Sequence, residues 1–171
     1  MPPRKTEPVK EVKRQGAYIG IDPGANGGLV CLFDDKTFIQ MMPETERDIW
    51  DWFNQWKGVP VFGIIEKVGG FMGGTGRNVA SGHTMFNFGL SYGVLRMAFI
   101  AAEIPFEEVP PRTWQKGLKI PPMSRTESKT EFKNRLKGLA QQLFPLEKVT
   151  LATSDALLIA EYCRRKREGC L

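Results

Sequence analysis

Three acidic residues of this chain occupy positions where a carboxylate is costly. Asp22 directly follows the apolar segment Tyr18–Ile21. Glu66 ends the apolar segment Gly63–Ile65, and Asp155 opens a mostly apolar segment near the end of the chain. A carboxylate at the end of a buried strand loses its hydration unless a partner compensates the charge. A divalent cation would compensate all three charges, so these acids are candidate metal ligands.

The other residue types narrow the kind of metal. The chain has one histidine, His83, and three cysteines without the spacing of a metal site. Carboxylates favour a hard cation such as Mg²⁺, with Mn²⁺ as an alternative. Two such ions about 4 Å apart can activate a water and stabilise the leaving 3′-oxygen of a phosphodiester. The sequence therefore favours metal-dependent hydrolysis of nucleic acid, catalysed by Asp22, Glu66 and Asp155.

Two of these acids also have a simpler interpretation. Asp22 precedes Pro-Gly and could form a turn, and Asp155 could stabilise a helix N-terminus through the helix dipole. Taken singly, these structural roles compete well with metal binding. The combination of two acids that end neighbouring strands with a third acid at a helix start favours the metal site.

The elements that must position these acids alternate between strands and helices. Apolar runs separated by turns predict an antiparallel meander, and a strand that follows a helix should run parallel to the first strand. The predicted strands are Tyr18–Ile21, Gly28–Phe33, Thr37–Met41, Gly63–Glu66 and Phe106–Val109, and the predicted helices are Arg47–Trp56, Met85–Ala102, Arg112–Gly117, Arg125–Leu143 and Ser154–Arg165. This order predicts an α/β fold with a mixed β-sheet, three antiparallel strands plus parallel strands, flanked by helices.

The length of 171 residues suits one domain. Residues 1–15 are rich in Pro, Lys and Glu and predict a flexible basic tail, which leaves residues 16–168 as the folded domain. The tail lacks the apolar stretch of a secretory signal, and no apolar run reaches the roughly 18–20 residues of a membrane span. We therefore expect a cytoplasmic protein with no membrane partner.

Positive charge is clustered in one segment of the chain. The formal net charge is +5, and residues 112–140 hold eight cations against two acids: Arg112, Lys116, Lys119, Arg125, Lys129, Lys133, Arg135 and Lys137. Clustered cations attract a polyanion because phosphate neutralisation releases condensed counterions. The alternative is a solvated surface. Four of these residues are our candidates for contact with nucleic acid phosphates: Arg112, Lys116, Lys129 and Lys133.

A glycine-rich segment, VGGFMGGTGRNVASGHT, follows Glu66. It lacks the dinucleotide fingerprint and the Walker pattern, so no small-molecule cofactor is expected. Phe71 and Met72 stand among the glycines, and we expect them to wedge between bases, with Arg77 and Asn78 on phosphate. The alternative is that Phe71 packs on the surface of its own domain.

Several segments resemble RuvC-type Holliday junction resolvases of the ribonuclease H-like superfamily. YIGIDPGANGG (18–28) resembles the first-strand signature of that family, IIEKVGGFM (64–72) its second acidic strand, and SDALLIAEY (154–162) its C-terminal acidic helix. FNFGLSYGVL (86–95) and EEVPPRTWQK (107–116) are similar to the central helix and the strand after it. The order of these segments, and KNRLKGLAQQLFP (133–145), are most similar to phage-borne and chloroplast-type members.

The resemblance implies a ribonuclease H-like fold in which the three acids hold a pair of divalent ions. It implies that Lys133 matches a lysine of the family's basic helix and faces the scissile phosphate. It also implies a homodimer that cuts opposed strands of a four-way DNA junction in recombination and repair, since two-fold symmetry matches the junction. Gly89 and Gly93 would permit close helix contact at a dimer interface or against the sheet. A phage-encoded member would act in the host cytoplasm.

One position departs from the family pattern. RuvC carries an acid three residues before the last one, where this chain has Ala152. The fourth ligand could then be a water, a hydroxyl of Thr153 or Ser154, or the carboxylate of Glu147 or Glu161. Two other functions stay open: a ribonuclease H-like nuclease on RNA–DNA hybrids, and a junction-binding protein with impaired catalysis.

Overall fold

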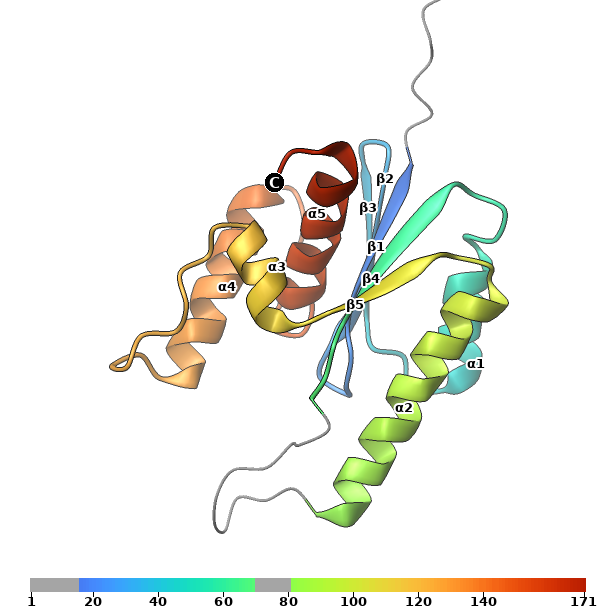
Figure 1. Cartoon of the computed structure of the whole chain (residues 1–171), viewed down its shortest axis with the longest axis horizontal. Helices are drawn as coiled ribbons and strands as arrows, with labels where there is room; N and C mark the ends of the chain where they lie inside the picture. The colour runs from blue at the N-terminus through green and yellow to red at the C-terminus, as the bar shows by residue number, and fades with distance from the viewer. Residues whose placement is uncertain (1–15, 70–80) are drawn as a thin grey trace, which may run out of the picture.

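The computed structural model of this chain describes residues 16–69 and 81–171 (Figure 1). This part of the chain folds into a single β-sheet with helices on both faces. The elements follow the chain in the order β1 (Ala17–Asp22), β2 (Gly28–Phe33), β3 (Lys36–Met41), α1 (Glu46–Asn54), β4 (Val61–Glu66), α2 (Gly82–Ala101), β5 (Phe106–Val109), α3 (Pro111–Gly117), α4 (Lys129–Leu143) and α5 (Ser154–Glu168).

The sheet is mixed, with strand order β3-β2-β1-β4-β5. The pairs β3–β2 and β2–β1 are antiparallel, whereas β1–β4 and β4–β5 are parallel. The parallel pairs are separated in sequence by helical crossovers, and the antiparallel strands are joined by short turns. The predicted meander and the predicted parallel strands are both confirmed.

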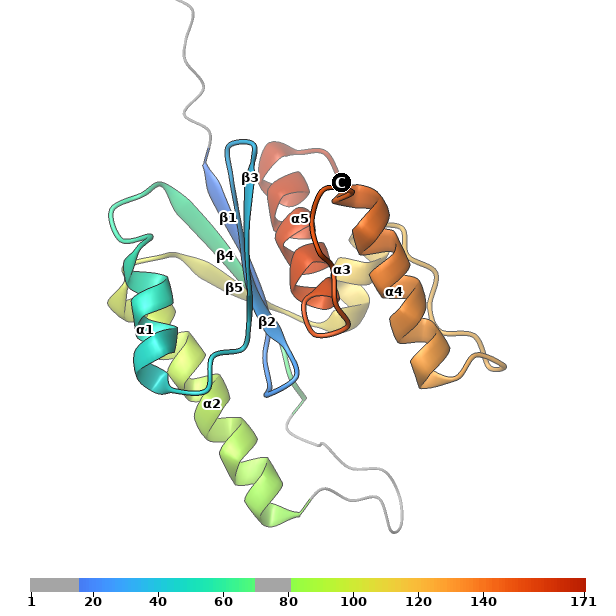
Figure 2. The ribbon, with the colours of Figure 1, turned by 180° about the vertical axis from the view of Figure 1, so that it is seen from behind.

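The two faces of the sheet carry different helices. Helices α1 and α2 cover one face and α3, α4 and α5 cover the other, as the opposed views of Figures 1 and 2 show. Because side chains alternate along a strand, Ile19 and Ile21 of β1 pack in the core with α1 and α2. Val30 and Ile64, from the neighbouring strands, pack in the core on the α5 side. None of the described helices is long and apolar enough to span a bilayer.

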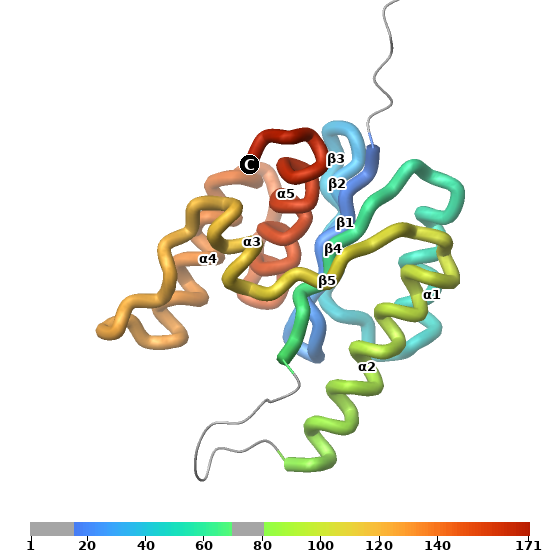
Figure 3. The backbone as a smooth tube through the Cα atoms, viewed as in Figure 1, coloured from blue at the N-terminus to red at the C-terminus, as the bar shows by residue number. Residues whose placement is uncertain are grey.

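Helix α5 lies directly on the backbone of β1. A Cβ atom at Gly20 would come within 2.2 Å of the Ala160 backbone nitrogen and 2.4 Å of the Ala156 carbonyl oxygen. A glycine at this position therefore permits a contact that any side chain would prevent. The consequence is that the N-terminal turn of α5 meets the carboxyl end of β1 (Figure 3).

The three largest differences from the predicted helix boundaries, of three or four residues each, are in α4, α2 and α5. Helix α4 begins at Lys129 and not at Arg125, because Ser128 and Glu131 form a reciprocal capping box that ends the preceding loop. Helix α2 begins at Gly82, three residues before the predicted start at Met85. Helix α5 continues past Arg165 to Glu168, where Gly169 in a left-handed conformation terminates it.

Candidate active site

The three acids predicted as metal ligands lie at one end of the sheet. Parallel pairing sets Ile21 of β1 beside Ile65 of β4, so that Asp22 and Glu66 end neighbouring strands. Asp155 lies in the first turn of α5, which packs on β1 through Gly20. In Figure 3 the ends of β1 and β4 and the beginning of α5 occupy the same end of the sheet.

The charges of these acids interact with one another. Burial raises the pKa of Asp22 to about 8, and the carboxylates of Asp155 and Glu66 add to the shift. Burial raises the pKa of Glu66 as well, with a further contribution from Asp155. Acids that raise one another's pKa values share a small, poorly hydrated volume. Such a volume favours a bound cation.

Lys133 supplies a cation to this volume from α4. Its ammonium group forms an ion pair with Oδ2 of Asp155. Burial lowers the pKa of Lys133, but the carboxylates of Asp155, Asp22 and Glu66 outweigh burial and raise it overall. The Asp155 side chain is 5% exposed and the Lys133 side chain 49% exposed, so the lysine is the partner that has room to move.

Glu66 has a different partner, which the sequence did not reveal. The indole Nε1 of Trp114 donates a hydrogen bond of 2.8 Å to Oε2 of Glu66. Trp114 comes from α3 and is completely buried. One signal in the sequence was the single tryptophan of the polar segment PRTWQK. A buried tryptophan usually finds a hydrogen-bond partner for its N–H.

The donor set fits a hard divalent cation in the type of its ligands, which are all carboxylates. Three carboxylates converge, and the raised pKa of Asp22 marks a charge that lacks sufficient compensation. Within residues 16–69 and 81–171, no three acidic, histidine or cysteine side chains are already gathered into a ligand cluster. Lys133 lies against Asp155 instead, so side chains must move to surround an ion.

Two of the residues suggested as a fourth ligand lie at the start of α5, Thr153 as its N-cap and Ser154 as its first residue. The Ser154 hydroxyl donates to Oδ1 of Asp155 at 3.3 Å, and therefore lies at the site. The Thr153 hydroxyl lies 3.0 Å from that of Thr150 and accepts from the Thr150 backbone N–H at 3.1 Å. Thr153 is thus engaged in shaping the turn, and Ser154 is the better candidate.

Two of the predicted DNA contacts lie on α3 and form a basic surface with a third cation. Arg112 and Lys116 are exposed, as is Lys119 just after the helix. These three cations line one groove together with Pro121 and Pro122. Within the described part of the chain, none of the three forms an ion pair with an acid. Lys129 is likewise exposed, at the first turn of α4.

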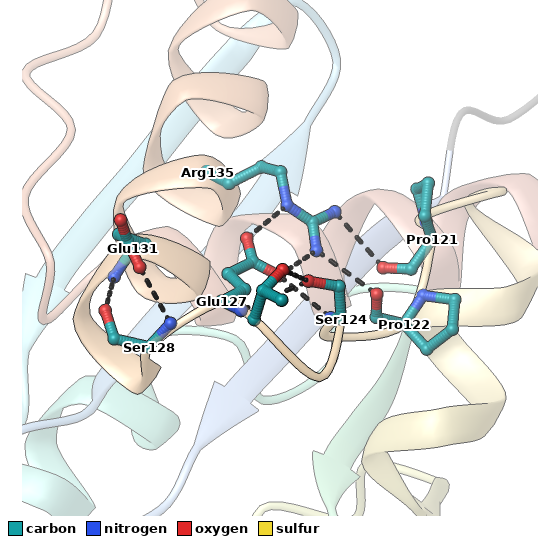
Figure 4. Close-up of polar contacts among 8 residues, drawn as sticks. Pro121, Pro122, Ser124, Glu127, Ser128, Glu131 and Arg135 are labelled. Carbon is teal, nitrogen blue, oxygen red and sulfur yellow. Dashed lines mark hydrogen bonds and ion pairs between the residues drawn. The ribbon is translucent and has the colours of Figure 1, made fainter.

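Arg135 belongs to the same basic segment but has a structural role (Figure 4). Its Nε and Nη2 atoms donate to the two carboxylate oxygens of Glu127 at 2.9 and 3.0 Å. Its Nη1 atom donates to the carbonyl oxygen of Pro121 at 3.1 Å. Arg135 therefore ties the loop between α3 and α4 to α4, and is less available to phosphate than its charge suggested.

The cations at the end of α5 are also paired within the chain. Arg164 and Arg165 both bond to the carboxylate of Glu161. These bonds overcome the effect of burial and lower the pKa of Glu161. Glu161 is thus engaged with two arginines of its own helix, and its role as a fourth ligand stays a prediction. Lys166 pairs with Glu107, and the guanidinium of Arg167 lies 4.4 Å from the Phe62 ring centroid.

The glycine-rich segment after Glu66 carries four predicted DNA contacts. These residues lie outside the part of the chain that the structure describes: Phe71, Met72, Arg77 and Asn78. Their contact with bases and phosphates stays a prediction.

The fold is similar to that of RuvC from Thermus thermophilus. One structure of that protein matches with a TM-score of 0.56 at 16% sequence identity, covering 90% of this chain and 97% of that chain. A second, of T. thermophilus RuvC in complex with Holliday junction substrate, matches with a TM-score of 0.58 at 15% identity and the same coverage. No protein-family model and no curated protein matches the sequence. The predicted RuvC-type, ribonuclease H-like fold is confirmed.

Proposed function

We propose that this chain is a structure-selective endonuclease that resolves four-way DNA junctions by metal-dependent hydrolysis of phosphodiesters. The observation that carries the proposal is the convergence of Asp22, Glu66 and Asp155 beside Lys133, at the end of a RuvC-type sheet. A site with this charge is suited to bind cations and, through them, phosphate.

Each residue has a distinct part in the proposed reaction. Asp22, Glu66 and Asp155 would hold Mg²⁺ or Mn²⁺, which would activate water and stabilise the leaving oxygen. Lys133 pairs with Asp155 and is half exposed, so its ammonium group can turn toward a phosphate that enters the site. Ser154 bonds to Asp155 and holds that carboxylate in place at the start of α5.

The basic groove on α3 supports a nucleic acid substrate. Arg112, Lys116 and Lys119 present three cations on one surface, and Trp114 of the same helix bonds to Glu66. A phosphate backbone bound in this groove would contact the helix whose buried side bonds to Glu66. The T. thermophilus RuvC with a similar fold is seen with a Holliday junction substrate, which supports a branched DNA as the ligand here.

We further propose that the chain acts as a homodimer through α2. Phe86, Leu90, Met97 and Ile100 are exposed apolar residues of this helix, between 53% and 69% exposed. With Gly93 between Leu90 and Met97, they recur at intervals of four, three, four and three residues and so form one stripe. A stripe centred on Gly93 can pair with its own copy about a two-fold axis, because Leu90 would then meet Met97 of the partner.

Nothing within the described chain covers this stripe. A Cβ atom at Gly89 or Gly93 would meet no atom within 4 Å, so this side of α2 does not pack on the sheet. An apolar hollow of about 550 Å³ lies beside it, between α1 and α2. Exposed apolar surface of this extent on one helix is typical of an association surface.

A cleavage assay tests the function. We expect the protein with Mg²⁺ to nick a synthetic four-way junction at symmetric positions in opposed strands, and to leave a linear duplex of the same sequence intact. Degradation of the RNA strand of a hybrid duplex would favour the ribonuclease alternative. A gel shift without cleavage would favour a binding protein with impaired catalysis, consistent with Ala152 in place of an acid.

A further inference from the structure

Trp114 is the one residue of α3 that is fully buried, and it contacts one of the three acids, Glu66. Its ring packs in the core with Leu118, Leu136 and Ala140, which come from the segment after α3 and from α4. The single polar atom of the ring, Nε1, meets Oε2 of Glu66 at 2.8 Å. A fully buried indole in an apolar core is a donor whose position cannot easily change.

This bond restrains the Glu66 carboxylate. A glutamate at the end of a strand has three rotatable side-chain bonds and would otherwise sample several rotamers. The bond to Trp114 fixes Oε2, whereas Oε1 accepts no hydrogen bond from the described residues. One oxygen is therefore held by the core and the other stays available to ligate a cation.

We propose that Trp114 is a positioning residue, which sets Glu66 for metal binding. The proposal rests on the proposed function, because it assumes that Glu66 ligates the ion. It also connects two parts of the site, since Arg112 and Lys116 lie on the exposed side of the same short helix.

The substitution Trp114→Phe tests the role without DNA or cleavage. Phenylalanine keeps an aromatic ring in the core and removes the N–H donor. We expect Mn²⁺ binding to the protein alone, measured by titration calorimetry, to weaken about 10–100-fold, the range typical of residues that orient a metal ligand. Incorporation of benzothienylalanine at position 114, which keeps the bicyclic shape without the N–H, should give the same loss and addresses any instability of the phenylalanine variant.

Trp56 provides the matched control. It is also buried, but its indole Nε1 has no hydrogen-bond partner among the described residues. Trp56→Phe removes the same ring volume without breaking a hydrogen bond, and should therefore leave Mn²⁺ affinity within about twofold of the wild type. If Trp114→Phe binds Mn²⁺ as tightly as Trp56→Phe does, the proposal is overturned. Absence of Mn²⁺ binding by the wild type would instead refute the proposed function.

Discussion

The three acids of the site differ in the partner that each has. The core indole of Trp114 holds Glu66, and the half-exposed ammonium group of Lys133 pairs with Asp155. Asp22 accepts no side-chain hydrogen bond from the described residues, and its pKa is raised to about 8. These differences give each acid a separate experimental signature.

At the residue scale, Lys133 and a metal ion compete for Asp155. We expect Lys133→Met to lower the melting temperature of the metal-free protein, because Asp155 loses its partner. The loss in free energy of unfolding should be smaller than the about 3–5 kcal/mol that breaking a fully buried ion pair costs, since Lys133 is half exposed. The same variant should bind Mn²⁺ more tightly by calorimetry and yet cleave the junction more slowly.

Lys137 serves as the control for this experiment. It lies one turn further along α4 and forms no ion pair with a described acid. Lys137→Met should leave the melting temperature and Mn²⁺ affinity unchanged. Unchanged or weaker Mn²⁺ binding in the Lys133 variant would show that the lysine does not occupy the place of the cation.

The pKa of Asp22 predicts how stability depends on pH. The folded protein keeps the Asp22 proton to about pH 8, whereas this carboxyl ionises near 3.8 when unfolded. The folded state therefore binds more protons between these values, and stability falls as the pH rises. The stabilisation from this group is complete below about pH 4 and is lost as the pH rises through about 8.

Thermal melts from pH 5 to pH 8 without metal check this prediction. The wild type should lose melting temperature with rising pH more steeply than Asp22→Asn, which has no proton to lose. Mg²⁺ should flatten the wild-type curve, because it replaces the proton. Equal slopes for the two proteins would contradict the prediction.

At the element scale, the strands that carry the acids were predictable from the sequence. The start of α4 and the side-chain contacts that hold the acids in place were not. Apolar runs that stop at Asp22 and at Glu66 follow from the sequence alone, because strand ends and their acids are adjacent in the chain. The start of α4 was predicted at Arg125 because the amphipathic pattern continues into the loop. The helix begins at Lys129 instead, because Ser128 caps it. The bond from Trp114 to Glu66 joins residues 48 positions apart, which no local pattern reveals.

The contact between α5 and β1 gives a prediction for Gly20. A methyl group there would lie 2.2 Å from the backbone of Ala160, and backbone cannot rotate away as a side chain can. We expect Gly20→Ala to lower the free energy of unfolding by about 1–3 kcal/mol or more, as overpacking of a core does. It should also weaken Mn²⁺ binding, because Asp155 moves with α5. Chemical denaturation and calorimetry measure the two effects, and Gly138→Ala, where a Cβ meets nothing within 4 Å, is the control.

At the scale of the whole molecule, the distribution of charge matters more than its total. Arg135 and the cations of α5 are engaged within the chain, and the cations that line the α3 groove are exposed. The sequence predicted a basic segment correctly but could not separate structural arginines from available ones, because that distinction depends on partners distant in the chain.

Association through α2 is the prediction at this scale. Leu90→Glu places a charge in the exposed apolar stripe, and we expect it to convert a dimer into a monomer, measured by light scattering after gel filtration. The monomer should keep its melting curve at low concentration and lose paired cleavage of the junction. Leu146→Glu, at an exposed position far along the chain on the loop after α4, should leave the dimer intact. A wild type that is monomeric at micromolar concentration would contradict the proposed assembly.

The rate at which Asp22→Asn cuts a four-way junction tests the central claim most directly. The substitution keeps the size of the side chain and removes the charge needed for a cation. We predict that the variant binds the junction as the wild type does. Its rate of cleavage should fall by more than about 100-fold, the upper end of the effect typical of residues that only support a metal ligand. Asp34→Asn, in the turn between β2 and β3, should cut at the wild-type rate. An Asp22→Asn variant that cuts as fast as Asp34→Asn would contradict the account.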